Sequence, residues 1–238
     1  MFAASGKYTD SQFLAAGKAL EEAREFELAI QSYDKANSLT KDKTVAALAK
    51  LGRARTLVGQ KRFSDAYKLL EEFTKEYAKL RIVVDANMFL IEVASEMGKA
   101  EKNNEERKRL FNSAIAALSM VKGYTKDPAE LKELDLKAGE ILVRKMQAER
   151  ALGLKEMSVE TRGHAIVAFT GIVVSIDPNN VALANVLEKA YYNSLPLMVE
   201  HKLYEDAISD GEKYLKQFPN GKYRTDVQNW INQAKITK

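Results

Sequence analysis

The chain has 238 residues; 46% of them are hydrophobic and 29% charged, as in ordinary globular proteins, and the formal net charge is +4. Lysine and arginine alternate with glutamate and aspartate along the whole chain, so there is no basic stripe of the kind that binds nucleic acid. The chain has no cysteine, which excludes disulfides and thiolate chemistry, and its 4 prolines and 12 glycines permit long helices.

The first expected elements form a helical hairpin. Thr9 and Gln12 have the spacing of a capping box, which predicts a helix from about residue 10 to 23. Apolar residues recur every three or four positions over 26–39 and predict a second helix there. Because only two or three residues separate these helices, they must run antiparallel. A second hairpin is expected next, with Ser64 as the N-cap of its second helix.

The first two hairpins differ in the spacing of their small residues. Gly17 and Gly52 are 35 residues apart, whereas Ala29 and Ala66 are 37 residues apart. A two-residue insertion around positions 59–62 would explain the difference, and the glycines then define equivalent positions in the two hairpins.

Two less regular helical pairs are expected in the middle of the chain. They cover about 81–97 with 104–121, and 128–152 with 158–176. The first helix of this region is apolar nearly all round, which predicts that it is sandwiched between neighbours. Asp127, Pro128 and Glu130 form a helix start with an N-cap, a proline in the first turn and a capping-box partner.

The C-terminal region predicts a fifth pair and a final helix. These elements cover about 181–201, 204–217 and 222–236. Pro196 lies inside the first of them and should kink it. The last helix has one apolar side and a polar remainder, which is typical of the open end of a helical repeat array.

Small and aromatic residues recur with one spacing near both ends of the chain. They are Phe13, Ala16, Gly17, Leu20, Ala29, Tyr33 and Ala36, and later Tyr204, Ala207, Tyr214 and Pro219. This pattern resembles the tetratricopeptide repeat (TPR), a helix–turn–helix unit of 34 residues. The resemblance implies an all-α fold, a right-handed superhelical solenoid of about five antiparallel helix pairs with a C-terminal capping helix.

The resemblance is closest over residues 9–78 and 180–219. We therefore expect a single TPR-like solenoid over residues 1–238, divided into a flexible N-terminus (1–8), two clear repeats (9–78), degenerate repeats (80–160), further repeats (161–219) and a capping helix (221–238).

The turn at residues 218–223, followed by Trp230, is similar to repeats of bacterial envelope proteins. Examples are the periplasmic coordinator of the Tol–Pal system and the outer-membrane assembly lipoprotein. The compartment stays open between periplasm and cytoplasm, because the start Met1–Ser5 fits either a mature N-terminus after removal of an export signal or a natural cytoplasmic start. The least polar window, 165–176, is too short to span a bilayer, so we expect a buried core helix there and no direct membrane insertion.

No catalytic constellation is evident in the sequence. His164 and His201 lie outside any metal-binding spacing, and the sequence contains no phosphate-binding glycine motif. We therefore expect no cofactor, no metal site and no enzymatic activity.

The TPR resemblance implies that a protein or peptide partner binds in a concave groove lined by the first helix of each pair. The residues expected to face this groove are Lys18 and Glu21 of the first repeat, Arg53 and Thr56 of the second, and Lys189 and Tyr192 of the last. Tyr192 is equally compatible with an ordinary packing role, and its neighbour Tyr191 is expected to pack between helices. Leu14 stands where the carboxylate clamp of chaperone-binding relatives has a lysine, which argues against recognition of such tails.

The leading functional hypothesis is a non-enzymatic scaffold or adaptor that binds a peptide or a partner helix in the groove. The alternative is a self-associating structural subunit of a larger complex, such as one of the cell envelope. A helical-repeat enzyme or ligand carrier is disfavoured because no catalytic constellation is present.

Overall fold

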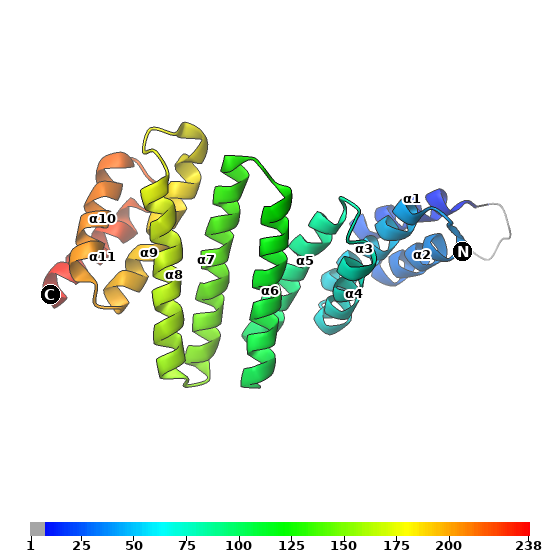
Figure 1. The fold of residues 1–238 in the computed structure, drawn as a ribbon, viewed down its shortest axis with the longest axis horizontal. Coiled ribbons are helices and arrows are strands. Elements are labelled where there is room, and N and C mark those ends of the chain that lie inside the picture. The colour runs from blue at the N-terminus through cyan, green and yellow to red at the C-terminus, as the bar shows by residue number, and fades with distance from the viewer. Residues whose placement is uncertain (1–7) are drawn as a thin grey trace. The chain divides into compact units, whose positions relative to one another are not determined.

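The computed structural model describes residues 8–238; of the expected flexible N-terminus, only Tyr8 is therefore described. The described residues form eleven α-helices and one short 3-10 helix, η1, and the fold is all-α as predicted (Figure 1). The helices are α1 (Asp10–Glu22), α2 (Phe26–Leu39), α3 (Lys43–Gly59), α4 (Phe63–Glu76), α5 (Val83–Ala100), α6 (Asn104–Tyr124), α7 (Pro128–Ala151), α8 (Lys155–Ser175), α9 (Ala184–Glu200), α10 (Tyr204–Gln217) and α11 (Arg224–Thr237), with η1 at Val181–Leu183.

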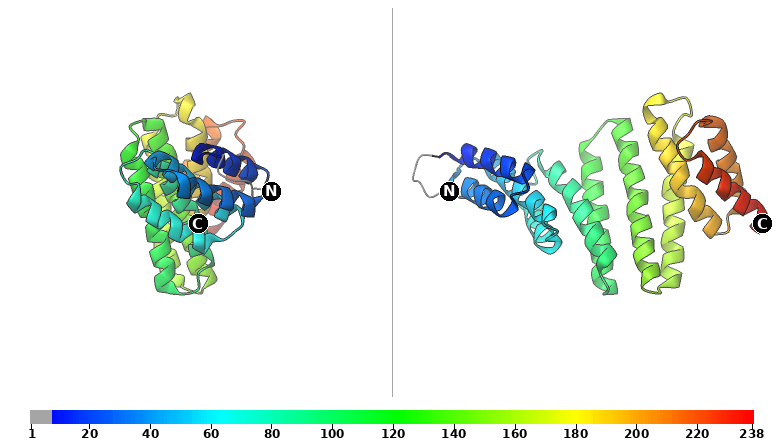
Figure 2. Two further views of the ribbon diagram at one scale, coloured as in Figure 1. Left: turned by 90° about the vertical axis from the view of Figure 1, so that its right-hand side faces the viewer. Right: turned by 180° about the vertical axis from the view of Figure 1, so that it is seen from behind.

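The helices pack in consecutive pairs, as in TPR proteins. They belong to two compact units, one made of α1 to α6 without residues 99–104 and 122–124, and the other containing α7 to α11. Figure 2 shows the pairing from two further sides, with α7 and α8 side by side along their full length. Continuation of the two units into one right-handed solenoid stays a prediction.

Four of the hairpins share one turn. The second residue after the first helix has a positive φ in each of them: Arg24 (62°), Lys61 (59°), Gly153 (73°) and Lys202 (64°). The next N–H donates to a carbonyl five residues earlier, as Glu25 does to Leu20 at 2.8 Å. This hydrogen bond and the left-handed residue define the Schellman motif, a common end of α-helices. The shared turn aligns the pairs independently of their side chains, and it includes the α7–α8 pair, whose sequence matches the repeat poorly.

The turns place equivalent residues of the first two pairs 37 positions apart, because Arg24 corresponds to Lys61. The last pair is offset by 178 positions, because Arg24 also corresponds to Lys202. The expected insertion around residues 59–62 is therefore wrong, since the turn there has the same length as the others. Gly17 and Gly52 are not equivalent positions.

The Tyr33 ring explains why α1 and α3 each carry a glycine, at Gly17 and Gly52. Its side chain is fully buried in the first unit. A Cβ on Gly17 would lie 2.8 Å from the Tyr33 ring, and a Cβ on Gly52 would lie 2.4 Å from it. Both distances are far shorter than van der Waals contact, so α1 and α3 can approach the ring only with glycine at these positions.

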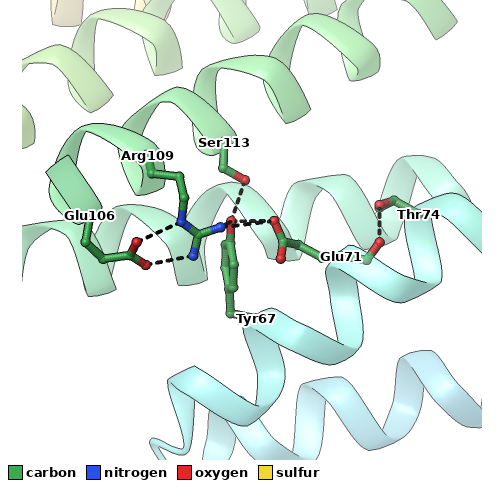
Figure 3. A network of polar contacts seen from close by, with 6 residues as sticks. All are labelled: Tyr67, Glu71, Thr74, Glu106, Arg109 and Ser113. Atoms are coloured by element: carbon green, nitrogen blue, oxygen red, sulfur yellow. Dashed lines mark hydrogen bonds and ion pairs between the residues drawn. The ribbon is translucent and has the colours of Figure 1, made fainter.

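A polar cluster joins α4 to α6 in the same unit (Figure 3). Arg109 binds the Glu106 carboxylate with two hydrogen bonds of 2.8 and 2.7 Å and lies over the ring of Tyr67, 5.3 Å from its centre. The Tyr67 hydroxyl donates to Glu71 at 2.7 Å and is hydrogen-bonded to Ser113 at 3.0 Å. Burial raises the pKa of Tyr67, so this hydroxyl stays protonated and holds the two helices together.

The second unit has one hydrophobic core to which α7 to α11 all contribute. Phe169 of α8 is fully buried and faces Gly139 of α7, where a Cβ would lie 2.4 Å from its ring. Pro196 lies inside α9, as expected, and the helix continues through it to Glu200.

Most helix starts agree with the sequence predictions, and three local details differ. The capping box of Thr9 and Gln12 is confirmed. Ser64 is not an N-cap, because α4 already begins at Phe63. Glu130 does not complete a capping box with Asp127, because its carboxylate accepts a hydrogen bond from the Thr125 hydroxyl instead.

The third detail concerns the least polar window, 165–176, which is only partly buried. Phe169 and Ile172 point into the core as expected. Val167 and Val174 lie on the opposite side of α8 and are exposed, so the expected buried core helix is buried on one face only.

Candidate functional site

A cavity of about 370 Å³ opens between α1 and α3 in the first unit. It is lined by Ser11, Leu14, Ala15 and Lys18 of α1, Tyr33 of α2, and Leu48, Leu51 and Arg55 of α3. This volume lies at the lower end of the range typical of ligand pockets. We call this cavity the first groove.

The first groove is built from equivalent positions of two successive repeats. The equivalent pairs, 37 residues apart, are Ser11 with Leu48, Leu14 with Leu51, and Lys18 with Arg55. On each helix the three positions cover eight residues, about two turns or ~10 Å. Leu14, Leu48 and Leu51 thus form the apolar part of the walls, and the two cationic positions lie together at one end.

A partly buried polar cluster lies at this cationic end. The Glu21 carboxylate accepts two hydrogen bonds from the Arg55 guanidinium, at 3.0 and 3.1 Å, and one from the Tyr33 hydroxyl at 2.6 Å. Burial and the bond to Glu21 raise the pKa of Tyr33, and the same carboxylate raises the pKa of Arg55. Tyr33 therefore stays neutral, and the charge of Arg55 is compensated inside the protein.

Lys18 differs from Arg55 in that its side chain is exposed, and it forms no ion pair with any residue of the described part of the chain. The first groove consequently combines an aliphatic wall with one uncompensated positive charge. This arrangement fits an apolar side chain accompanied by a carboxylate.

Two of the predicted groove residues lie elsewhere. Arg53 forms an ion pair of 3.3 Å with Asp34 and so faces α2. Thr56 is completely buried, and its hydroxyl donates to the Gly52 carbonyl at 2.9 Å. Both residues had been placed by equating Gly17 with Gly52, which shifts the register by two residues. Glu21 lies in the polar cluster beside the groove and does not line it.

Of the lining residues, only Lys18 was predicted from the sequence; those not assigned to the groove are Ser11, Leu14, Ala15, Tyr33, Leu48, Leu51 and Arg55. The 37-residue spacing of Ala29 and Ala66 would have identified Arg55, because the same spacing relates Lys18 to Arg55.

In the last pair the corresponding space is filled by the protein itself. Lys189 and Tyr192 on α9 are equivalent to Ser11 and Leu14, 178 residues earlier. The Tyr192 ring stacks on Tyr223 at 3.9 Å between centres and lies 5.4 Å from Trp230. Tyr192 thus packs against Tyr223 and Trp230 of its own chain, at the position where Leu14 lines the first groove.

Tyr191 packs between helices, as predicted. Its ring meets Tyr214 edge-on at 5.9 Å, and burial raises the pKa of Tyr191 to about 12. The Tyr214 hydroxyl donates to Glu188 at 2.8 Å, and Glu188 also accepts the Lys222 N–H at 2.8 Å. A Cβ on Gly221 would lie 2.5 Å from the Tyr214 hydroxyl, which explains the glycine in this turn.

Residues 8–238 contain no cluster of three or more histidine or acidic side chains placed to hold a metal ion. His201 accepts a hydrogen bond of 3.2 Å from Arg162, whose guanidinium also binds Glu200 at 2.6 Å. No helix in the same stretch of chain combines the length and apolar character that crossing a membrane requires.

Comparison with known proteins gives structural likenesses only. No family model and no curated protein sequence matches the chain. Among solved structures it is similar to a thermophilic TPR protein of Thermus thermophilus, with 16% identity, 96% of this chain and 100% of that chain covered, and a TM-score of 0.48. The TPR2AB domain of yeast Sti1 in complex with pHSP90 shares 15% identity, with 95% and 98% covered and a TM-score of 0.30. The assembly chaperone of RpL4 (Acl4) shares 13% identity, with 97% and 96% covered and a TM-score of 0.36.

These scores are too low to support a functional argument, so the TPR-like description rests on the consecutive helix pairs and their shared turn. A TPR-like fold is typical of protein–protein interaction scaffolds, and the partner of this chain follows from none of these likenesses.

Proposed function

We propose that the protein is a non-enzymatic scaffold that binds a short segment of a partner protein in the first groove. The observation that supports this most is the cavity between α1 and α3, which two successive repeats line with equivalent side chains. TPR-like helix pairs provide such surfaces through the first helix of each pair.

The dimensions of the first groove favour an extended peptide over a partner helix. The helices α1 and α3 contact each other directly, so the space between them accommodates side chains but not a helix about 10 Å across. An apolar side chain of the partner would lie against Leu14 and Leu48, and a nearby carboxylate would reach Lys18.

Selection of peptides from a random phage-displayed library tests this function. The groove variant combines Lys18→Ala with Leu48→Glu, because both side chains are exposed and their replacement spares the core. The matched control combines Lys35→Ala with Leu39→Glu on α2, which changes the same residue types at exposed positions outside the groove.

We expect peptides selected on the wild-type protein to bind the control within twofold. Their affinity for the groove variant should fall at least about tenfold, which corresponds to ~1.4 kcal/mol. Failure to select any peptide, or equal binding by a folded groove variant, would contradict the proposal.

A location in the bacterial cell envelope stays a prediction that rests on the turn at residues 218–223. Self-association, the alternative function, would use a surface other than the first groove.

A further inference from the structure

The outward face of α8 is apolar and uncovered. Val167 is 70% exposed and Val174 is 82% exposed, and no charged residue occurs from position 163 to 176. Figure 1 shows no other helix of the second unit in front of α8. A helix that is apolar on all sides is normally buried on all sides, so this face has the character of a contact surface.

Two glycines on this helix have no role in the packing of the chain itself. A Cβ on Gly171 would meet nothing within 4 Å, and a Cβ on Gly163 would meet only the His201 ring at 3.9 Å. Gly139 and Gly52, by contrast, each leave room for a buried aromatic ring. Because glycine inside a helix is destabilising relative to alanine, its use at 163 and 171 is explained if another backbone approaches closely there.

We propose that this face binds α8 of a second copy of the chain, antiparallel and related by a two-fold axis at the level of residue 169. In that register Val167 lies opposite Gly171 of the other copy, and His164 lies opposite Val174. Each valine thus faces either a glycine or the exposed imidazole ring of His164, and the two-fold axis repeats each contact.

Charge favours a second copy as the occupant. The face is uncharged over 14 residues, about 21 Å of helix, so a partner with charged side chains along its contact would bury them unpaired. A second α8 offers an uncharged face of the same length. Glu160 would lie opposite Pro178 and close to Asp177 of the other copy, so like charges meet only at the two ends of the pairing, outside the uncharged stretch.

The pairing should be weak and reversible. One helix face per copy is smaller than the roughly 800 Å² per partner of a standard stable interface. We therefore expect a monomer–dimer equilibrium with a dissociation constant of about 10 µM or higher, so the dimer fraction should rise with concentration.

Sedimentation equilibrium of the full chain over a range of concentrations tests the pairing. The Val167→Glu and Val174→Glu variants should each weaken the dimer at least tenfold. The matched control is Ile236→Glu on α11, where an equally apolar side chain is 86% exposed, and it should dimerise as the wild type does. A wild type that stays monomeric at all concentrations, or a dimer that both α8 variants retain, would overturn the proposal.

Cross-linking tests the register, and the cysteine-free chain makes single-cysteine variants unambiguous. In the proposed dimer His164→Cys lies opposite Val174→Cys, so a mixture of these two variants should react with a short bismaleimide. Each variant alone should react much less, because identical positions are then about 15 Å apart along the helices. Stronger reaction of each variant with itself would overturn the antiparallel arrangement. The contrary outcome is a wild type that binds lipid vesicles and forms no dimer in solution. If Val167→Glu also abolished that vesicle binding, the dimer proposal would be overturned in favour of a membrane surface.

Discussion

The first and last helical pairs have the same turn and opposite arrangements of large and small residues. In the first pair the large residue, Tyr33, lies on the second helix and faces glycines on α1 and α3. Gly211 is equivalent to Tyr33 in the last pair, and there Ile231 of α11 supplies the large side chain, since a Cβ on Gly211 would lie 2.6 Å from it.

The spaces between the first helices differ accordingly. Between α1 and α3 the Tyr33 hydroxyl donates a hydrogen bond to Glu21. The first groove, which Leu14, Leu48 and Leu51 help to line, stays open beside it. Between α9 and α11 the rings of Tyr192 and Trp230 occupy the corresponding space. One backbone arrangement thus produces either an open groove or a filled space between the first helices, depending on which helix carries the bulky residue.

The largest predicted effect is at Tyr33. Replacing it by alanine removes a fully buried ring and should lower the free energy of unfolding by about 3–5 kcal/mol. Urea denaturation followed by circular dichroism measures the change. The exposed Tyr8 provides the control, because Tyr8→Ala should change the free energy by less than about 0.5 kcal/mol. Equal effects of the two substitutions would show that Tyr33 does not organise the first unit.

The filled end is tested by Tyr192→Ala. Removing the ring that stacks on Tyr223 should cost about 2 kcal/mol. Trp230 is the one tryptophan of the chain, so its fluorescence reports this end selectively, and its emission should shift to longer wavelength as water enters. Tyr8→Ala should leave the emission unchanged. An unshifted emission in Tyr192→Ala would mean that the stack does not shield Trp230.

The polar cluster beside the first groove is tested by a double-mutant cycle with Glu21→Gln and Arg55→Gln. The two side chains are partly buried and joined by two hydrogen bonds, so their coupling energy should be about 1.5 kcal/mol. The exposed pair of Arg62 and Asp65 serves as the comparison, with an expected coupling of at most about 0.5 kcal/mol. Equal coupling in both pairs would show that burial adds nothing at Glu21.

Alkaline pH should weaken the fold through its buried tyrosines. The pKa of Tyr191 is raised to about 12, and burial also raises the pKa values of Tyr33 and Tyr214. The unfolded chain loses these protons first, near its ordinary pKa of about 10, so stability is intact below that pH and falls as pH rises above it. At pH 11 the Tyr191→Phe variant should have lost about 1 kcal/mol less than the wild type relative to pH 9. Identical losses would contradict the role of Tyr191.

The local elements of the fold were predictable from the sequence. The bounds of α2 and α10 agree with the predicted 26–39 and 204–217. The predicted start of α7 at Pro128 is also confirmed, because capping residues and apolar periodicity act over a few neighbouring positions.

The glycine spacing could not predict which residues of α3 are equivalent to the α1 residues that line the first groove. A glycine is required wherever the Tyr33 ring approaches a helix, and two different helices approach it. Gly17 and Gly52 therefore mark the two sides of one ring and not one repeat position. The contacts that fill the last pair join Tyr192 to residues more than 30 positions away, which local patterns do not reveal.

We propose that equivalent positions 37 residues apart on α1 and α3 form the binding surface. The most direct measurement is the affinity of one selected peptide for Leu48→Glu and for Arg53→Glu, each compared with wild type by fluorescence anisotropy. Leu48 lines the cavity, whereas Arg53 faces α2, and both side chains are similarly exposed on α3. We predict a loss of at least about tenfold for Leu48→Glu and less than twofold for Arg53→Glu. The reverse order, or equal losses, would contradict the claim.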